Sequence, residues 1–227
     1  MKVYNQPGPD NTGDLLTLVK QIQNNYQNIV IASVTGNSLK KACTILDKTK
    51  LIGVTCPSGM YFDVDKMCTG PFNDLAGLRK IRDNWKKDGL KKIEMGISQK
   101  DNDYFSSIGV KIVKGSIPFF SVSFSMRIHL GHINSIDIAA KTIELFSTGT
   151  LVCLETVLMA VDSGVLPEGV KVIALAGTEQ GLDTACIIRS CASANLYHPE
   201  KGARIIEYIA KPGISYIPNV DIQYLRS

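Results

Sequence analysis

Apolar residues recur along the first part of the chain at two spacings, one typical of helices and one typical of buried strands. Helical spacing begins after Asn11 and Thr12, either of which suits an N-cap, and puts five apolar residues on one face: Leu15, Leu16, Val19, Ile22 and Tyr26. The continuous apolar run 29–32 predicts a strand buried on both faces. A second helix is predicted around 39–46 and a second strand over 51–54. Strand, helix and strand at this pacing predict a right-handed βαβ unit with parallel strands.

The middle of the chain breaks this rhythm twice. Pro57, Gly59, Gly70 and Pro71 predict a long loop over 56–74, and long loops in compact domains often act as lids or binding loops. A helix with apolar positions 75, 78, 81 and 85 follows, then a shorter helix near 98–106 and a strand over 110–113. We expect a second irregular stretch over 115–133, which is rich in Ser and Phe, and then a helix capped by Asn134.

The last third of the chain predicts the centre and one edge of a sheet. A helix over 151–163 is apolar almost all round, which indicates a central position, and Gly164 and Pro167 are typical of its end. The run 170–176 predicts the main strand. Two further strand-like runs, 184–188 and 204–210, arrive without helices between them, so we expect antiparallel strands at one edge. The fold class is therefore α/β, a three-layer sandwich with a mostly parallel central sheet, formed by one domain over 1–227.

Composition and charge narrow the class of partner. The chain is 44% hydrophobic and 20% charged, as expected of a globular protein. Its net charge of +4 is mild, and no arginine cluster or basic–aromatic stripe is present, so we expect no nucleic-acid partner. No stretch reaches the roughly 18 apolar residues that span a bilayer, so we expect no membrane insertion. The six cysteines form no C-x-x-C pair and residues 1–14 are polar, which favours a cytoplasmic protein without a signal peptide.

Small polar residues follow three of the predicted strands, at the edge where open α/β sheets bind ligands. Glycine lets a backbone N–H approach an anion closely, and hydroxyl groups donate hydrogen bonds to it. These loops therefore predict a phosphate site, although a turn capped by Asn37 or Ser38 and a simple strand connection at 177–184 are the alternatives. No dinucleotide fingerprint or P-loop occurs. The candidate residues are Ser33, Thr35, Gly36, Asn37, Ser38, Thr55, Gly177, Thr178, Gly181 and Asp183.

Other side chains are candidates for charge and chemistry. Arg127, in the Ser-rich stretch, is the cation best placed for a phosphate, with an ordinary surface arginine as the alternative. Glu155 is a candidate base whose pKa burial would raise, and Cys56 is a candidate thiol, although an unreactive loop cysteine fits as well. His129 and His132 have helical spacing but lack a third ligand motif, so no metal site is predicted.

Several of these segments resemble the C-terminal α/β domain of pyruvate kinase, and they do so in the same order and spacing. The sequence is similar, over almost its whole length, to the stand-alone and mainly prokaryotic proteins of that domain family. The segments shared with the pyruvate kinase domain are Ile31-Ala-Ser-Val-Thr-Gly-Asn-Ser, Leu51-Ile-Gly-Val-Thr, Gly109-Val-Lys-Ile-Val and Val172-Ile-Ala-Leu-Ala-Gly-Thr. Those shared with the stand-alone proteins include Pro7-Gly8-x-x-Asn11-Thr12, the run from Glu155 to Gly164, and Gly181-x-Asp183-Thr-Ala.

The resemblance implies a site for a phosphorylated small molecule. In pyruvate kinase the first turn and the last glycine loop bind a phosphorylated effector, which points to residues 35–38 and to Gly177, Thr178 and Gly181 here. The effector turn there reads Thr-x-Ser-Gly-Arg-Ser, whereas this chain has Asn37 in place of the arginine. A single phosphate, such as that of flavin mononucleotide (FMN), therefore fits better than a bisphosphate. The catalytic barrel is absent from the sequence, so we expect no pyruvate kinase activity.

Three functions stay open at this point. The first is a binding protein for a phosphate-bearing compound such as FMN. The second is a flavin-dependent or phosphate-ester-processing enzyme, in which Glu155, Asp183 or Cys56 is the acting group. The third is a regulatory or assembly module without a bound cofactor. The oligomeric state is open too, a homo-oligomer included.

Overall fold

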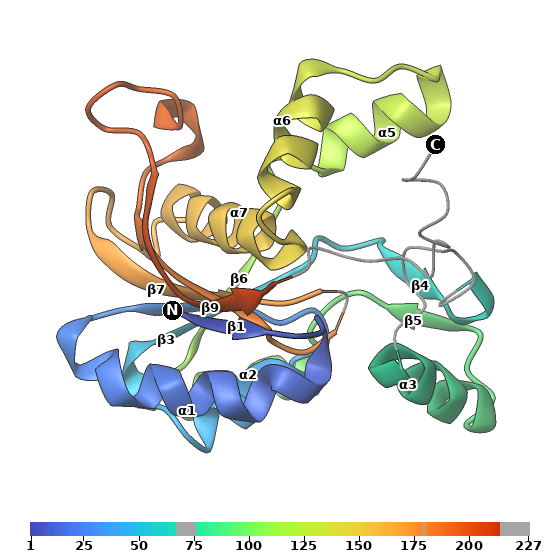
Figure 1. Ribbon diagram of the computed structural model, residues 1–227. Coiled ribbons are helices and arrows are strands. Elements are labelled where there is room, and N and C mark those ends of the chain that lie inside the picture. Colours follow the sequence, from blue (N-terminus) through green and yellow to red (C-terminus); the bar gives the residue numbers. More distant parts are fainter. Residues whose placement is uncertain (67–75, 179, 214–227) are drawn as a thin grey trace.

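A seven-stranded sheet runs through the middle of the protein, in the strand order β1-β9-β8-β7-β2-β3-β6 (Figure 1). The computed structural model describes residues 1–66, 76–178 and 180–213. β2 pairs in parallel with β3 and with β7, β3 with β6, and β1 with β9, whereas β8 is antiparallel to both of its neighbours. The strands are β1 (Lys2–Tyr4), β2 (Ile29–Ala32), β3 (Leu51–Thr55), β6 (Lys111–Lys114), β7 (Lys171–Ala176), β8 (Thr184–Arg189) and β9 (Arg204–Pro212).

Helices cover both faces of this sheet and so make three layers (Figure 1). One face carries α1 (Thr12–Ile22), α2 (Asn37–Cys43) and α4 (Gln99–Ser107). The other carries α7 (Thr148–Asp162), with α6 (Ser135–Glu144) packed against it and α5 (Ser121–Leu130) beyond. α3 (Ala76–Lys87) lies to one side, below a two-stranded sheet of β4 (Tyr61–Asp63) and β5 (Lys92–Glu94). Short 3-10 turns occupy Pro9–Asn11, Gln23–Asn25, Lys48–Lys50, Val64–Lys66 and Ser193–Asn195.

Alternate side chains of the central strands enter two separate apolar cores. Ile29 and Ile31 of β2 join the core under α1, α2 and α4, whereas Val30 between them packs with Val157 of α7. The side chains of Ile29, Val30, Ile31 and Val157 are all fully buried. A strand with an apolar layer on each face is apolar at every position, and this explains the continuous runs in the sequence.

The coarse architecture confirms the expected fold class. The predicted parallel pair of β2 and β3 is present, and so are the antiparallel additions β8 and β9. Asn134 caps α6 with a capping box, since its side chain accepts from the Asp137 N–H and the Asp137 carboxylate accepts from the Asn134 N–H. Gly164 adopts a left-handed conformation just after the end of α7, as its sequence position predicted.

Four details differ from the expectations. Residues 115–133 are not wholly irregular, because α5 forms within them. α7 begins three residues earlier than expected, where the Ser147 hydroxyl accepts the Thr150 N–H. The expected loop 56–74 contains β4, and its part from 67 on lies outside the described residues. β1 and β5 were missed, because each has three residues and leaves too short a pattern to see.

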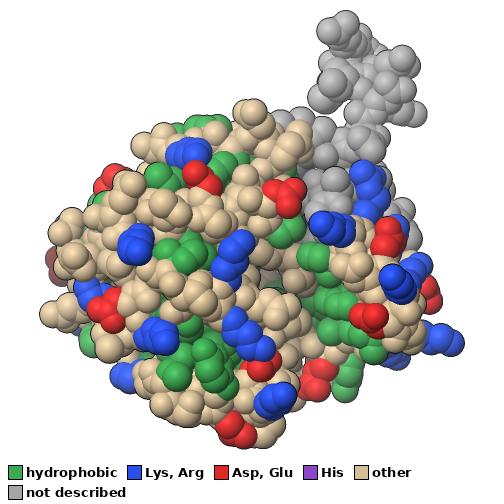
Figure 2. Space-filling view, turned by 90° about the horizontal axis from the view of Figure 1, so that it is seen from below, with side chains coloured by type: hydrophobic (Ala, Val, Ile, Leu, Met, Phe, Trp, Pro, Cys, Tyr) green, Lys and Arg blue, Asp and Glu red, His purple; other side chains and the backbone are tan. Residues whose placement is uncertain are grey.

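The described surface has mixed charge. Viewed from below Figure 1, on the side of α1 and α2, Lys, Arg, Asp and Glu side chains are interspersed and form no continuous basic stripe (Figure 2). Among the described residues, no helix is both long and apolar enough to cross a membrane.

Candidate functional site

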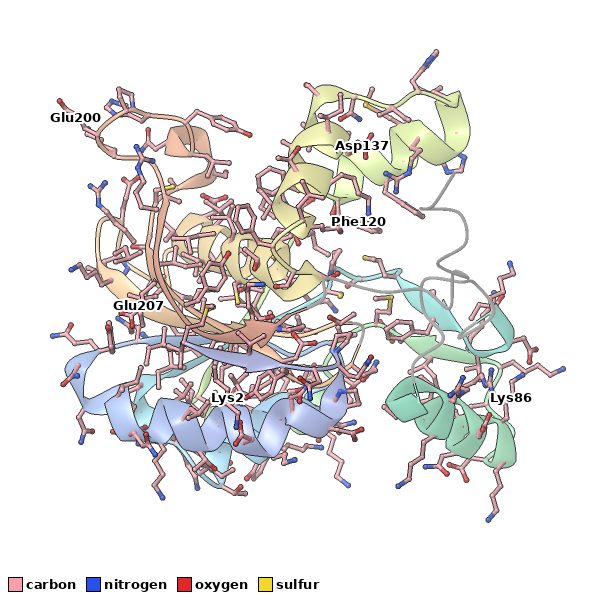
Figure 3. All side chains as sticks on the ribbon, in the orientation of Figure 1. Lys2, Lys86, Phe120, Asp137, Glu200 and Glu207 are labelled. Atoms are coloured by element: carbon pink, nitrogen blue, oxygen red, sulfur yellow. The ribbon has the colours of Figure 1, made fainter. Side chains whose placement is uncertain are left out.

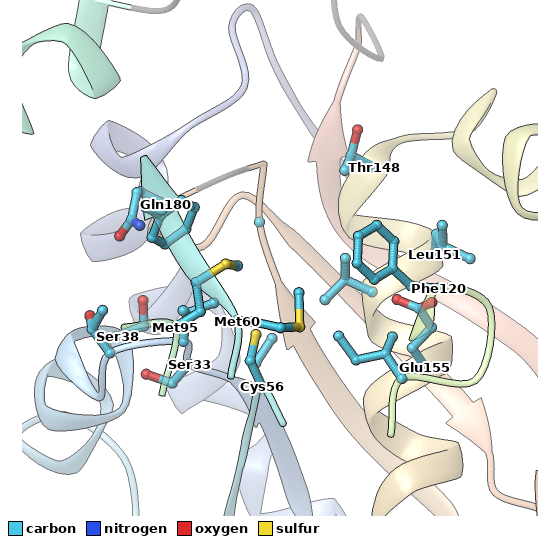
Figure 4. Close-up of a pocket in the computed structure, with 18 of the residues that line it drawn as sticks. Ser33, Ser38, Cys56, Met60, Met95, Phe120, Thr148, Leu151, Glu155 and Gln180 are labelled. Atoms are coloured by element: carbon cyan, nitrogen blue, oxygen red, sulfur yellow. The ribbon is translucent and has the colours of Figure 1, made fainter. Parts of the chain in front are cut away.

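A cavity of about 580 Å³ opens where β2, β3 and β7 end. Since these strands are parallel, their carboxyl ends meet at one edge of the sheet. Ala32 ends β2, Cys56 follows β3 and Gly177 follows β7, and all three line the cavity. The volume lies within the range of small-molecule and cofactor sites. Figure 4 shows its two walls, with Ser33 and Ser38 on one side and Glu155, Phe120 and Leu151 on the other.

The turn after β2 supplies four polar side chains to the cavity wall, from Ser33, Thr35, Asn37 and Ser38. Its only described side-chain hydrogen bond to the start of α2 comes from Ser33, whose Oγ accepts the Leu39 N–H at 3.2 Å. Neither Asn37 nor Ser38 caps the helix. The N-cap residue is Gly36, which has no side chain to bond to the first turn. The expected alternative of a turn capped by Asn37 or Ser38 is therefore wrong. Both side chains line the cavity together with Thr35.

Gly36 and Thr55 support this turn from behind the cavity wall. Gly36 is buried and has a φ of 86°, a left-handed conformation that favours glycine. Thr55 donates to the Val34 carbonyl at 2.8 Å and accepts from the Ile97 N–H at 3.2 Å. Neither residue lines the cavity, so both act on a ligand only through the shape of the turn.

The glycine loop after β7 forms the adjoining part of the wall. Gly177, Gln180 and Gly181 line the cavity, whereas Thr178 and Asp183 are buried and do not. The Asp183 carboxylate accepts hydrogen bonds from the Thr178 and Gly8 backbone N–H groups and from the Thr184 hydroxyl. These contacts occupy it, and burial raises its pKa. Asp183 is therefore a structural residue of the loop.

An apolar wall faces these polar groups. Met60 precedes β4 and Met95 follows β5, so the small sheet brings both thioethers to the cavity. The opposite side comes from the start of α5 and from α7. Thioethers adapt to irregular and flat surfaces and make favourable contacts with aromatic rings. The larger apolar residues of the lining include Met60, Phe62, Ile81, Met95, Ile117, Phe119, Phe120, Leu151 and Val152.

Glu155 is the one carboxylate of α7 that reaches the cavity wall. It is only 6% exposed, and its Oε1 atom has no hydrogen-bond partner among the described residues. Burial raises its pKa to about 8, helped by the negative charge of Glu144, while the Phe119 N–H opposes the rise. At neutral pH most of this carboxyl is protonated and neutral, so it can donate a hydrogen bond inside an apolar wall.

Cys56 faces the same cavity but is a poor nucleophile. Burial, with the nearby Glu155, raises the pKa of its thiol to about 11. The thiolate is the reactive form of cysteine, so this thiol stays unreactive at neutral pH. The described part of the chain therefore favours the unreactive reading of Cys56.

Arg127 lies on the cavity wall, but on α5 and not in a loop as expected. Its Nη1 is 2.6 Å from Oδ1 of Asp137, which also accepts the Ser123 hydroxyl at 2.6 Å. Figure 3 shows Asp137 between α5 and α6. This network explains why a Ser-rich segment forms a helix, because it ties α5 to the capped start of α6. It also means that a carboxylate already balances the Arg127 charge.

Lys41 lines the cavity as well, although the sequence pattern did not single it out. It lies on α2, four residues after Asn37, and so shares the helix face of that residue. This spacing was a usable signal, since a residue one turn after a ligand-binding position points the same way. His129 and His132 are exposed, and no group of three His, Cys, Asp or Glu that could hold a metal occurs among the described residues.

The cavity thus brings together seven of the expected site residues: Ser33, Thr35, Asn37, Ser38, Arg127, Gly177 and Gly181. Gly36, Thr55, Thr178 and Asp183 do not line it. In a comparison with known protein families, no family model matches this sequence.

Proposed function

We propose that this protein binds a small molecule with one phosphate and a flat apolar body, such as FMN. The observation that carries the proposal is a single cavity with two chemically different walls. Hydroxyl, amide and glycine backbone groups of the turn after β2 and of the glycine loop would hold the phosphate. The apolar body would lie between the thioethers of Met60 and Met95 and the rings of Phe119 and Phe120.

The residues present fit FMN in size and in chemistry. The cavity volume suits a cofactor of that class. The buried Oε1 atom of Glu155 lacks a partner, and a ring carbonyl or N–H of the ligand would supply one. When bound, FMN supplies a ring system that can be reduced and reoxidised. The resemblance to the pyruvate kinase C-terminal family belongs to the same proposal, supported by the parallel β2–β3 pair and by the site at the strand ends.

The experiment is a binding assay with a matched pair of variants. The purified chain is examined for flavin absorbance and then titrated with FMN by fluorescence. Thr148 lines the cavity, so Thr148→Phe should fill it and abolish binding. Thr17 is exposed on α1, so Thr17→Phe should bind like the wild type. The flavin form of the proposal fails if no flavin copurifies and wild type does not bind FMN at micromolar concentration.

A second function, an enzyme that moves a proton to or from its ligand, is favoured by one observation. The pKa of Glu155 is raised to about 8, and a general acid or base works best with a pKa near the operating pH. Glu155→Gln keeps the size and hydrogen-bonding groups but cannot exchange this proton. Turnover lost with ligand affinity retained would support the enzyme. Equal turnover in both proteins would leave Glu155 a binding residue only.

A further inference from the structure

Three cations line the described cavity wall, and two of them are already balanced. Arg127 pairs with Asp137, and Lys141 pairs with Glu144. Lys41 lines the same cavity and forms no ion pair with a described residue. Glu155 is mostly neutral at neutral pH and so does not balance Lys41. The cavity wall therefore carries one uncompensated positive charge, that of Lys41.

The ammonium of Lys41 lies against the start of α1. It is 3.7 Å from the place that a Cβ on Gly13 would occupy. A helix N-terminus carries a partial positive charge, so a second cation there is unfavourable unless an anion lies between them. The acid of this turn, Asp14, does not fill that role, because its carboxylate binds Lys2 and the Tyr4 hydroxyl, each at 2.7 Å.

The first turn of α1 also lacks a side-chain cap. Its N-cap residue Asn11 donates its side-chain N–H groups to the carbonyls of Gln6 and Gly8 and forms no side-chain cap hydrogen bond to the helix. Thr12 bonds its hydroxyl to the Pro9 carbonyl and receives the Leu182 N–H. The Thr12 N–H bonds to the Pro9 carbonyl, and no side-chain cap balances the partial positive charge at the start of this 11-residue helix.

Gln180 adds an orphaned donor to the same place. Its Nε2 atom is buried and has no hydrogen-bond acceptor among the described residues. The next residue, Gly181, packs directly on Pro9 and Thr12, which puts the glycine loop beside the start of α1. Gln180 lines the cavity as well, on the side of Ser38 (Figure 4). A buried donor without an acceptor costs free energy until a ligand supplies one.

We propose that Lys41, Gln180 and the first turn of α1 form a subsite for the dianion of a phosphate monoester. This inference rests on the proposed function and names the residues that select its ligand. The Lys41 ammonium and the Gln180 Nε2 atom are hydrogen-bond donors, and the start of α1 adds a partial positive charge, which together suit an anion. One uncompensated cation suits one phosphate and disfavours a bisphosphate.

The test compares Lys41→Gln with Lys20→Gln, which removes the same charge from the far end of α1. The probes are inorganic phosphate and phenyl phosphate, with sodium chloride at equal ionic strength as the salt control, and the readout is Tm. Both phosphates should raise the Tm of wild type and of Lys20→Gln, and Lys41→Arg should keep the rise. Lys41→Gln should lose it, with an affinity about tenfold weaker. No rise in wild type, or an equal rise in Lys41→Gln, overturns the proposal.

The variant Gln180→Met tests whether Gln180 binds the phosphate or has only a structural role. Removal of a buried unpaired donor should leave the ligand-free Tm equal or higher, while phosphate affinity falls several-fold. A lower ligand-free Tm with unchanged phosphate affinity would contradict the subsite.

A flavin pair distinguishes failure of this inference from failure of the proposed function. Wild type should prefer FMN to riboflavin, which lacks the phosphate, and Lys41→Gln should lose about tenfold of that preference. FMN binding with the preference intact in Lys41→Gln overturns the subsite and leaves the proposed function standing. Stabilisation by phosphate that needs Lys41, without any flavin binding, supports the subsite and overturns only FMN as the ligand.

Discussion

The carboxylate of Asp183 accepts a hydrogen bond at 2.9 Å from the backbone N–H of Gly8, although the two residues are 175 positions apart in the sequence. The same oxygen accepts the Thr178 N–H at 3.0 Å, and the other oxygen accepts the Thr184 hydroxyl at 2.8 Å. One buried side chain therefore holds the glycine loop and the segment before α1 together. Both segments line the cavity, so the shape of the proposed phosphate end depends on this contact.

Replacement of Asp183 should destabilise the fold. Asp183→Ala leaves the N–H groups of Gly8 and Thr178 buried without acceptors, and we expect a loss of about 3 kcal/mol in the free energy of unfolding. Asp183→Asn keeps one acceptor oxygen and should lose less. Urea unfolding measures both variants. Asp10→Ala, on the exposed surface of the same segment, is the control and should change stability by less than about 0.5 kcal/mol.

Gly181 should tolerate no side chain, because the segment before α1 packs directly on it. Its φ is 77°, and an added Cβ would lie 2.3 Å from the Cα of Pro9. We expect Gly181→Ala to cost more than about 3 kcal/mol and to weaken phosphate binding, since Pro9 and Thr12 must move. Gly164 has a φ of 72° but no atom within 4 Å of its added Cβ, so Gly164→Ala should cost only about 1 kcal/mol. Equal losses in urea unfolding would show that backbone conformation alone matters.

The layers of the fold could be predicted from the sequence because burial leaves a strong pattern. β2 is apolar at every position since it contacts both cores, and α1 has a clear apolar face. No helix was predicted between β7, β8 and β9, and this absence correctly predicted that these strands pair antiparallel. The Ser-rich α5 gave no such pattern, because its helix depends on hydrogen bonds and an ion pair to α6.

The site was predicted in part for a similar reason. Small polar residues at strand ends are a local signal, and the topology brings those ends to one edge. Met60 and Met95 could not be found this way, because two three-residue strands far apart in sequence bring them to the cavity. The sequence also does not show which polar residues are already paired, and so Asp183 and Arg127 looked as available as Ser38.

The contact between Arg127 and Asp137 should make the α5–α6 pair sensitive to acid. Hydrogen bonds from Ser123 and from the Asn134 N–H, with the Arg127 charge, lower the pKa of Asp137. A lowered folded-state pKa contributes stability above the unfolded value that is lost as the pH falls through the folded value. Wild type should therefore lose helicity and bind a hydrophobic dye at low pH, since separation of α5 and α6 would expose buried apolar residues such as Phe119 and Ala140. Asp137→Asn should be less stable at neutral pH, with a flatter acid profile. If Asp137→Asn loses stability with acid as steeply as wild type does, carboxylates other than Asp137 cause the loss.

Glu155 should give the opposite pH dependence. Its folded-state pKa of about 8 lies above the ordinary glutamate value of 4.5, so the stability linked to its proton is fully present below about pH 4.5 and is lost as the pH rises toward 8. We expect this component to reach on the order of 4 kcal/mol in full. Glu155→Gln stays neutral at every pH, so the difference between the two unfolding curves isolates the carboxyl.

Near pH 5 the two proteins should therefore have similar stability, and near pH 9 Glu155→Gln should be the more stable one. Glu144→Gln provides an internal check on the cause. The negative charge of Glu144 helps to raise the pKa of Glu155, so its removal should lower that pKa, and the stability loss should end at a lower pH and be smaller. In practical terms, Glu144→Gln should lose less stability between pH 5 and pH 9 than wild type does. A difference between wild type and Glu155→Gln that does not change with pH would mean that this carboxyl titrates normally in the folded protein.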